Sequence, residues 1–156
     1  ERRMLFEEYV QGIGLDRVVK TLATEKLDES DLELIRRAGR LVAAVHARGY
    51  TLGDCKPENV ILAPNDKLFV VDLEQASKGG NKVWDVAEFV YYGCRYGVHR
   101  AGISAMTKSF VQGYLEEGSR DVVVAASRPH YTRVFAPFAP AHLLMETSKD
   151  LAAAKL

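Results

Sequence analysis

The sequence predicts an α+β domain that is mostly helical and carries one small antiparallel β-hairpin near its middle. Three observations lead to this fold class. Apolar residues recur at helical spacing over residues 30–48 and again over residues 103–114. Two short β-rich runs, 59–62 and 68–71, are joined by a Pro-Asn-Asp-Lys turn and therefore form a hairpin. The length of 156 residues, with 47% of them hydrophobic and 27% charged, suits one globular domain.

The first half of the chain contains two helices before the hairpin. Residues 4–10 are expected to form a strand at an edge, and residues 15–22 a short helix. Ser30 and Glu33 have the spacing of a capping box, in which each side chain satisfies a backbone N–H at the start of the next helix. Gly49 ends that helix, because a left-handed backbone is cheap for glycine. Its apolar face comprises Leu34, Ile35, Ala38, Leu41, Val42 and Val45.

The second half is predicted to be helical. A helix is expected over residues 83–92, and another stops near Gly118. Residues 121–126 and 139–156 also have helical patterns, with prolines 129, 137 and 140 as breaks between helices. The apolar face of the helix before Gly118 comprises Ile103, Met106, Phe110, Val111 and Tyr114.

Composition excludes several classes of protein. Twenty-one basic residues balance twenty-one acidic ones, so we expect no direct binding to nucleic acid or to an anionic membrane. No apolar run approaches the roughly 20 residues that a membrane span needs. Cys55 and Cys94 share no metal-type spacing with the histidines, which favours a reducing, cytoplasmic setting. Because position 1 is Glu rather than Met, we interpret the chain as a piece of a longer protein.

Four polar residues around the hairpin form a candidate site for phosphoryl chemistry. Asp54, Lys56 and Asn59 precede the first hairpin strand at D-x-K-P-x-N spacing, and Asp72 follows the second strand. Antiparallel neighbours lie about 5 Å apart, so Asn59 and Asp72 can face the same space. A carboxylate and an amide oxygen, completed by phosphate oxygens and water, suit Mg²⁺. Lys56 supplies a charge for a phosphoryl group, and Asp54 can accept the proton of an attacking hydroxyl.

Each of these residues also has a simpler interpretation. Asp54 and Asn59 can cap turns, Asp72 can be the polar end of a strand, and Lys56 can be a solvated charge. Taken singly, the structural interpretation is preferred for each of them. Their joint spacing between a helix and a hairpin favours the functional interpretation.

The segment from Gly53 to Leu62 resembles the catalytic loop of Ser/Thr kinases in the protein-kinase-like superfamily. This resemblance implies that Asp54 is the catalytic base, Lys56 the γ-phosphate contact and Asn59 a metal ligand. Asp72 stands where such kinases place the Asp-Phe-Gly metal motif, which implies that it is the second metal ligand. The fold implied is the C-terminal lobe of a kinase.

The resemblance also divides the chain and assigns nucleotide contacts. Residues 1–10 resemble the hinge and residues 11–156 the C-terminal lobe, while the N-terminal lobe with its glycine-rich loop is absent from this chain. Main-chain groups of Glu8 and Val10 would contact the adenine base, and Ile61 would lie beneath it. The N-terminal lobe of the same protein is therefore an expected partner.

The chain departs from typical protein kinases at several positions. Leu52 stands where a histidine often opens the catalytic loop, and Glu74 replaces the glycine of the metal motif. The interval between Asp72 and Asp85 is too short for a long activation loop. Asp85 resembles the acid that braces the catalytic loop through its backbone amides, so it is assigned a structural role. These features are similar to compact, atypical branches such as the RIO, lipopolysaccharide and aminoglycoside or choline kinases.

The predicted function is ATP-dependent phosphate transfer with Mg²⁺ or Mn²⁺ as cofactor. The acceptor is expected to be a Ser or Thr hydroxyl of a protein. A small hydroxylated molecule is an alternative acceptor, as in aminoglycoside or choline kinases. A further alternative is a pseudokinase or ATPase subunit of a larger complex, such as a tRNA-modification assembly. The isolated fragment is expected to be a poor enzyme, because the lobe that holds the α- and β-phosphates is missing.

Overall fold

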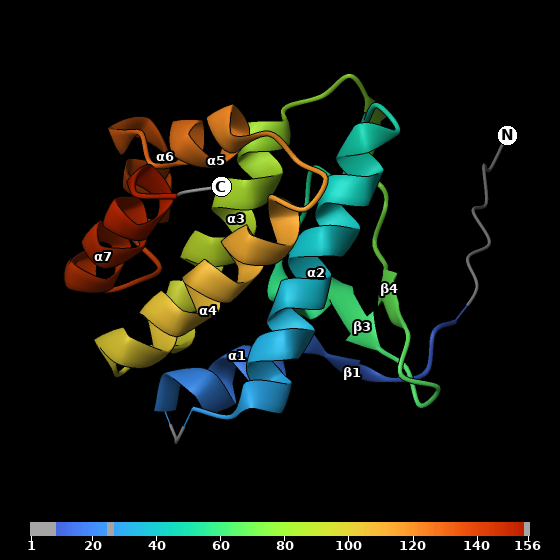
Figure 1. The fold of residues 1–156 in the computed structure, drawn as a ribbon, viewed down its shortest axis with the longest axis horizontal. Helices are drawn as coiled ribbons and strands as arrows, with labels where there is room; N and C mark the ends of the chain where they lie inside the picture. The colour runs from blue at the N-terminus through green and yellow to red at the C-terminus, as the bar shows by residue number, and fades with distance from the viewer. Residues whose placement is uncertain (1–8, 25–26, 155–156) are drawn as a thin grey trace, which may run out of the picture.

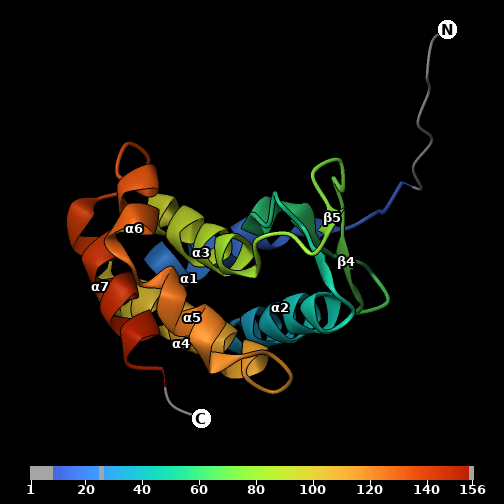
Figure 2. The same cartoon turned by 90° about the horizontal axis from the view of Figure 1, so that it is seen from above.

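The computed structural model describes residues 9–24 and 27–154. Within these residues the chain folds into seven α-helices and two small antiparallel sheets, so the predicted mostly helical α+β class is confirmed (Figure 1). In Figure 1, strands β3 and β4 (within residues 60–70) lie on one side of helix α2 (Glu29–Ala47), and helices α3 to α7 (within residues 82–152) lie on the other. Seen from above in Figure 2, β4 and β5 lie toward the end of the molecule opposite α6 and α7. None of the helices described is long and apolar enough to cross a membrane.

The helices follow the predicted pattern with one addition. The helices before the hairpin are α1 (Leu15–Thr24) and α2 (Glu29–Ala47), and the others are α3 (Lys82–Gly93), α4 (Arg100–Tyr114), α5 (Arg120–Ala126), α6 (Pro129–Phe135) and α7 (Ala141–Ala152). Helix α6 was not predicted. Pro129 was interpreted only as a break, but a proline is tolerated at the first position of a helix, where its missing N–H costs nothing.

The predicted hairpin is present. Strand β3 (Val60–Leu62) pairs antiparallel with β4 (Leu68–Val70), and Val60 lies opposite Val70. A short strand β1 (Ile13–Gly14) adds to the free edge of β3 and gives the order β1-β3-β4. The expected strand over residues 4–10 lies mostly outside the described residues, and Tyr9 and Val10 have no regular secondary structure.

The second sheet was missed by sequence analysis. Strand β2 (Tyr50–Thr51) pairs antiparallel with β5 (Ser77–Lys78), although each strand is only two residues long. The Thr51 and Ser77 hydroxyls lie 3.2 Å apart, and the Gly79 amide donates to the Gly49 carbonyl. This pairing ties the segment between β4 and α3 back to the end of α2.

The expected capping box at the start of α2 is wrong. Asp28 is the N-cap residue, and its carboxylate accepts hydrogen bonds from the Ser30 amide at 2.7 Å and the Ser30 hydroxyl at 2.5 Å. A negatively charged carboxylate at this position also interacts favourably with the helix dipole, whereas an uncharged serine cap does not have this charge interaction. At the other end, Gly49 adopts φ +83, so the predicted glycine stop is confirmed.

Helix α3 is the centre of the helical layer. Most of its residues are buried, because α1, α2, α4, α5, α6 and α7 all contact it. Phe89 of α3 stacks on Phe110 of α4 with ring centroids 4.3 Å apart. Helices α2 and α4 approach closely where Gly39 faces the Phe110 carbonyl and Gly113 faces the Arg36 carbonyl, so no side chain fits at either glycine. These contacts position α2 and α3 on either side of the loop that follows β2.

Candidate functional site

The D-x-K-P-x-N segment lies in the loop between β2 and β3. It ends in a short 3-10 turn (Pro57–Asn59) that leads directly into the hairpin. Asp54 is buried, with 8% of its surface exposed, whereas Lys56 and Asn59 are half-buried. The loop therefore holds its acid inside the protein and leaves the lysine and the amide at its surface.

In the structure Lys56 and Asn59 both contact Asp54 directly. The Lys56 ammonium lies 2.6 Å from Asp54 Oδ1. The Asn59 amide nitrogen donates to Asp54 Oδ2 at 3.0 Å and to the Asp54 carbonyl at 2.9 Å. The hydrogen bond with Asp54 raises the pKa of Lys56, so this side chain stays charged. Because the Asn59 nitrogen faces Asp54, the amide oxygen is left as an acceptor on the other side.

Asp72 lies next to this group through the backbone. The Val71 amide donates to the Asn59 carbonyl at 2.9 Å, which places Asp72 one residue beyond the end of the hairpin ladder. Its side chain is exposed, and its backbone has φ 57. Non-glycine residues with positive φ are uncommon and are enriched at ligand sites. The hairpin thus brings Asn59 and Asp72 to the same edge, as the pairing geometry predicts.

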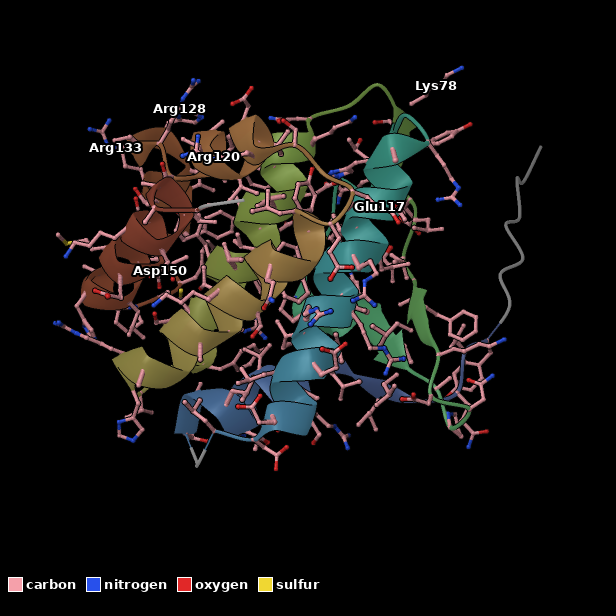
Figure 3. The ribbon with its side chains drawn as sticks, in the orientation of Figure 1. Lys78, Glu117, Arg120, Arg128, Arg133 and Asp150 are labelled. Carbon is pink, nitrogen blue, oxygen red and sulfur yellow. The ribbon has the colours of Figure 1, made fainter. Side chains whose placement is uncertain are left out.

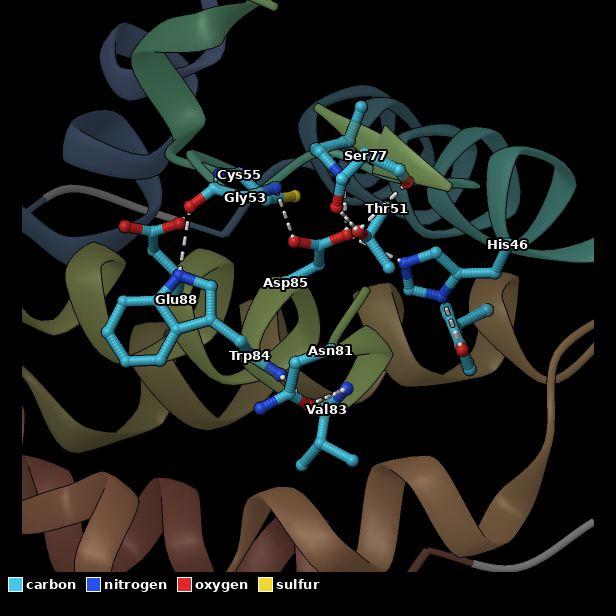
Figure 4. A network of polar contacts seen from close by, with 12 residues as sticks. His46, Thr51, Gly53, Cys55, Ser77, Asn81, Val83, Trp84, Asp85 and Glu88 are labelled. Atoms are coloured by element: carbon cyan, nitrogen blue, oxygen red, sulfur yellow. Dashed lines mark hydrogen bonds and ion pairs between the residues drawn. The ribbon is translucent and has the colours of Figure 1, made fainter. Parts of the chain in front are cut away.

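Asp85 holds the start of the loop from inside the protein (Figure 4). It is fully buried in the first turn of α3. Its Oδ1 accepts from the Gly53 amide at 2.8 Å, and its Oδ2 accepts from the Leu52 amide at 2.7 Å. This is the contact expected of a residue that braces the loop through backbone amides.

His46 on α2 completes the bonding of Asp85. Its Nε2 lies 2.8 Å from Asp85 Oδ2, and its Nδ1 lies 2.7 Å from the Tyr114 hydroxyl. A carboxylate can only accept, so Nε2 carries a proton and donates to Asp85. His46 is therefore buried and joins α2, α3 and α4 through hydrogen bonds.

Two further residues of α3 hold the backbone of the loop. Glu88 Oε2 accepts from the Cys55 amide at 2.7 Å. The Trp84 indole N–H donates to the Gly53 carbonyl at 3.0 Å. Cys55 itself is buried, and burial next to Asp85 and Glu88 raises the pKa of its thiol well above the usual value. Cys55 is therefore a packing residue and a poor nucleophile.

The residues assigned to nucleotide contact are only partly visible. Glu8 lies outside the described residues, and Val10 is half-buried in a segment without regular structure. Ile61 lies in β3, opposite Phe69 of β4 and Gly14 of β1, and its side chain packs over Gly12. The structure therefore places Ile61 on the hairpin next to the loop.

Glu88 should make stability depend on pH. Burial raises the pKa of its carboxyl from 4.5 to about 7. The folded state then binds this proton more tightly than the unfolded chain, so ionisation opposes folding. We expect the free energy of unfolding to fall by about 2 kcal/mol through this group between about pH 5 and about pH 8. Urea unfolding across this range, with Glu88→Gln as the comparison, measures it.

The glutamine variant keeps the contact but removes the titration. Its side-chain oxygen can still accept from the Cys55 amide. We expect its stability to decline less than that of the wild type as pH rises. Parallel profiles for the two proteins would mean that Glu88 is already ionised in the folded state at the lower pH.

Sequence analysis missed the supporting roles of His46, Glu88 and Trp84. A signal exists for Glu88, which follows Asp85 by one helical turn on a helix that is otherwise apolar. Two acids on the same face of such a helix indicate a shared polar partner, since buried charges need one. The partner of His46 has no local signal, because Asp85 lies on another helix.

The comparisons with known proteins add no assignment. No model of a known protein family matches the chain, and no curated protein matches its sequence. The functional argument therefore depends on the residues and their geometry.

Proposed function

We propose that this chain is the C-terminal lobe of a compact, atypical kinase and takes part in Mg²⁺-dependent phosphate transfer from ATP to a hydroxyl group. One observation carries the proposal: Lys56 and Asn59 both contact Asp54 in a loop that α3 holds through Asp85 and Glu88. A site that only stabilises a turn would not need a buried acid paired with a half-buried lysine. Charged groups held in fixed positions are what phosphoryl transfer requires.

The donor set fits a magnesium ion. The Asn59 amide oxygen faces away from Asp54, and the Asp72 carboxylate is exposed one residue beyond the same ladder. Mg²⁺ prefers one or two carboxylates or amides and completes its coordination with phosphates and water. Asn59 and Asp72 would hold the ion, and its charge would offset that of the transferred phosphoryl group.

The chain's own residues would act on the acceptor. The acceptor oxygen forms a bond to the γ-phosphorus as the bond from that phosphorus to the bridging oxygen of ADP breaks. The acceptor proton passes to the Asp54 carboxylate. Lys56 stays charged and can shift from Asp54 toward the phosphoryl oxygens. The hydrogen bonds from Asn59 hold Asp54 in place during this step.

The acceptor is a protein Ser or Thr hydroxyl or a small hydroxylated molecule. The connection between β4 and α3 favours the second candidate. Pairing of β5 with β2 keeps this connection short and close to α2, which leaves no extended segment to support a peptide. A panel of small hydroxylated metabolites tested beside Ser-containing peptides, with labelled ATP, separates the two.

Asp72→Asn in the intact protein tests the metal assignment. Even outer-shell partners of a metal ligand are worth about 10- to 100-fold in metal affinity, so loss of a carboxylate ligand should weaken Mg²⁺ binding by at least about 10-fold and raise the Mg²⁺ concentration needed for half-maximal transfer. The measurement is phosphate transfer from ATP at a series of Mg²⁺ concentrations. Asp121→Asn, an exposed acid at the start of α5, serves as the matched control. An unchanged Mg²⁺ dependence in Asp72→Asn would contradict the assignment of Asp72 as a metal ligand.

A further inference from the structure

We propose that Arg95 selects acceptors that carry a carboxylate or phosphate group; this proposal rests on the phosphotransferase function proposed above. Arg95 lies in the 3-10 turn (Cys94–Tyr96) that follows α3. Its guanidinium makes cation–π contacts with two rings, with its central carbon 4.4 Å from the Tyr92 centroid and 4.6 Å from the Tyr96 centroid. Stacking between aromatic rings fixes the plane of a guanidinium and leaves its N–H edge for planar anions.

The N–H edge of Arg95 is available. Within residues 9–24 and 27–154 the guanidinium donates no hydrogen bond, and its ion pair with Glu58 is long, with 3.9 Å between Arg95 Nη1 and Glu58 Oε1. That separation exceeds hydrogen-bond distance. Other arginines differ: Arg36, Arg37 and Arg40 on α2 all donate to acidic residues. Arg95 is thus ordered by stacking rather than by a hydrogen-bonded partner, and its side chain is 35% exposed.

Arg95 and Lys56 both contact the ring of Tyr92, which links Arg95 to the proposed reacting groups. The Lys56 ammonium lies 5.4 Å from the centroid of the same Tyr92 ring that Arg95 contacts. Lys56 contacts Asp54, so Arg95 is linked to Asp54 through the Tyr92 ring and Lys56. A carboxylate or phosphate near the hydroxyl of the acceptor can therefore reach the guanidinium.

The surroundings explain why such a residue is needed. Asp54, Glu58 and Glu88 are acidic groups around this loop, and Lys56 is already paired with Asp54. An anionic acceptor would meet repulsion here without a cation of its own. Glu58 Oε2 accepts from the Tyr96 hydroxyl at 3.3 Å, so Glu58 also helps to hold one of the two stacking rings. Arg95 would accept the anion in a bidentate contact.

Transfer assays with matched acceptors test this role in the intact protein. The peptide arm uses a Ser peptide flanked by Asp, by Asn or by Lys, and the small-molecule arm uses glyceric acid and its uncharged amide. In whichever of the two sets contains a phosphorylated acceptor, we expect Arg95→Ala to raise the KM for the anionic acceptor by about 10- to 100-fold. The KM for ATP should not change. Arg95→Lys should recover only part, because an ammonium cannot form the bidentate contact. Arg128→Ala is the control, since Arg128 is exposed at the start of α6 (Figure 3).

A binding measurement separates this proposal from the function on which it rests. Phosphoserine is titrated without ATP, and tyrosine fluorescence reports the environment of Tyr92 and Tyr96. Binding to the wild type and to Arg128→Ala but not to Arg95→Ala supports the anion site, even where no acceptor is phosphorylated and the phosphotransferase function fails. Equal KM values for anionic and neutral acceptors in the wild type and in Arg95→Ala overturn the proposal and leave the function intact. A preference for the Lys-flanked peptide also overturns it.

Discussion

Asp54→Asn is expected to lower the rate of phosphate transfer by about 100- to 10,000-fold in the intact protein, the usual contribution of a positioned general base. An asparagine keeps the shape of Asp54, and its side-chain oxygen can still accept from Asn59. It cannot accept the proton of the acceptor, and it no longer pairs with Lys56. The loss should therefore appear in kcat, with little change in the affinity for ATP. Single-turnover transfer from labelled ATP, together with equilibrium ATP binding, measures both quantities.

The control for this variant is Asp121→Asn, which changes an exposed acid far from the loop in sequence. Its transfer rate should equal that of the wild type. A rate for Asp54→Asn within a few-fold of the wild type would show that Asp54 is not the base. No transfer by the wild type under any condition would favour the pseudokinase alternative.

Asp85→Ala is expected to cost about 3–5 kcal/mol of folding free energy, the penalty for breaking a buried, hydrogen-bonded charged group. The substitution leaves the Leu52 and Gly53 amides and His46 Nε2 without their acceptor inside the protein. Asp85 itself has no exposed surface, so water cannot replace it without local opening. Urea unfolding followed by circular dichroism gives the free energy.

Asp121→Ala again provides the matched control and should change stability by less than about 1 kcal/mol, the scale of a charge near a helix N-terminus. If Asp85→Ala does not fold, Asp85→Asn provides a measurable variant. Its amide oxygen can accept from one of the loop amides, but its NH₂ group faces the other donors, so a loss of about 2 kcal/mol or more is expected. A stability within about 1 kcal/mol of the wild type for either variant would contradict the bracing role.

Local sequence patterns were sufficient to predict most helices and the hairpin. Helix α4 follows from its apolar spacing, and the turn between β3 and β4 follows from its Pro, Asn and Asp residues. Asp66 in this turn adopts φ 61, which suits a residue type that tolerates the left-handed region. These features depend on residues within a few positions of one another, so they can be read without a structure.

Elements that depend on distant partners were not predictable. Strands β2 and β5 are each two residues long and exist because residues 50–51 and 77–78 meet. The pattern of Ser77 and Lys78 alone indicates a polar loop. The predicted N-cap of α2 was wrong for a different reason. Ser30 and Asp28 both suit an N-cap, and the sequence does not say which of them precedes the first turn.

By itself the sequence determined the composition of the candidate site: an acid, a lysine and an amide at fixed spacing, with a second acid after the hairpin. Short-range geometry brings Asp54, Lys56 and Asn59 together, and strand pairing adds Asp72. Only the tertiary structure decided what supports this group and what surrounds it. His46 meets Asp85, and Glu88 meets Cys55, because α2 and α3 pack on either side of the loop. Such contacts arise from the packing of whole helices, which no local pattern encodes.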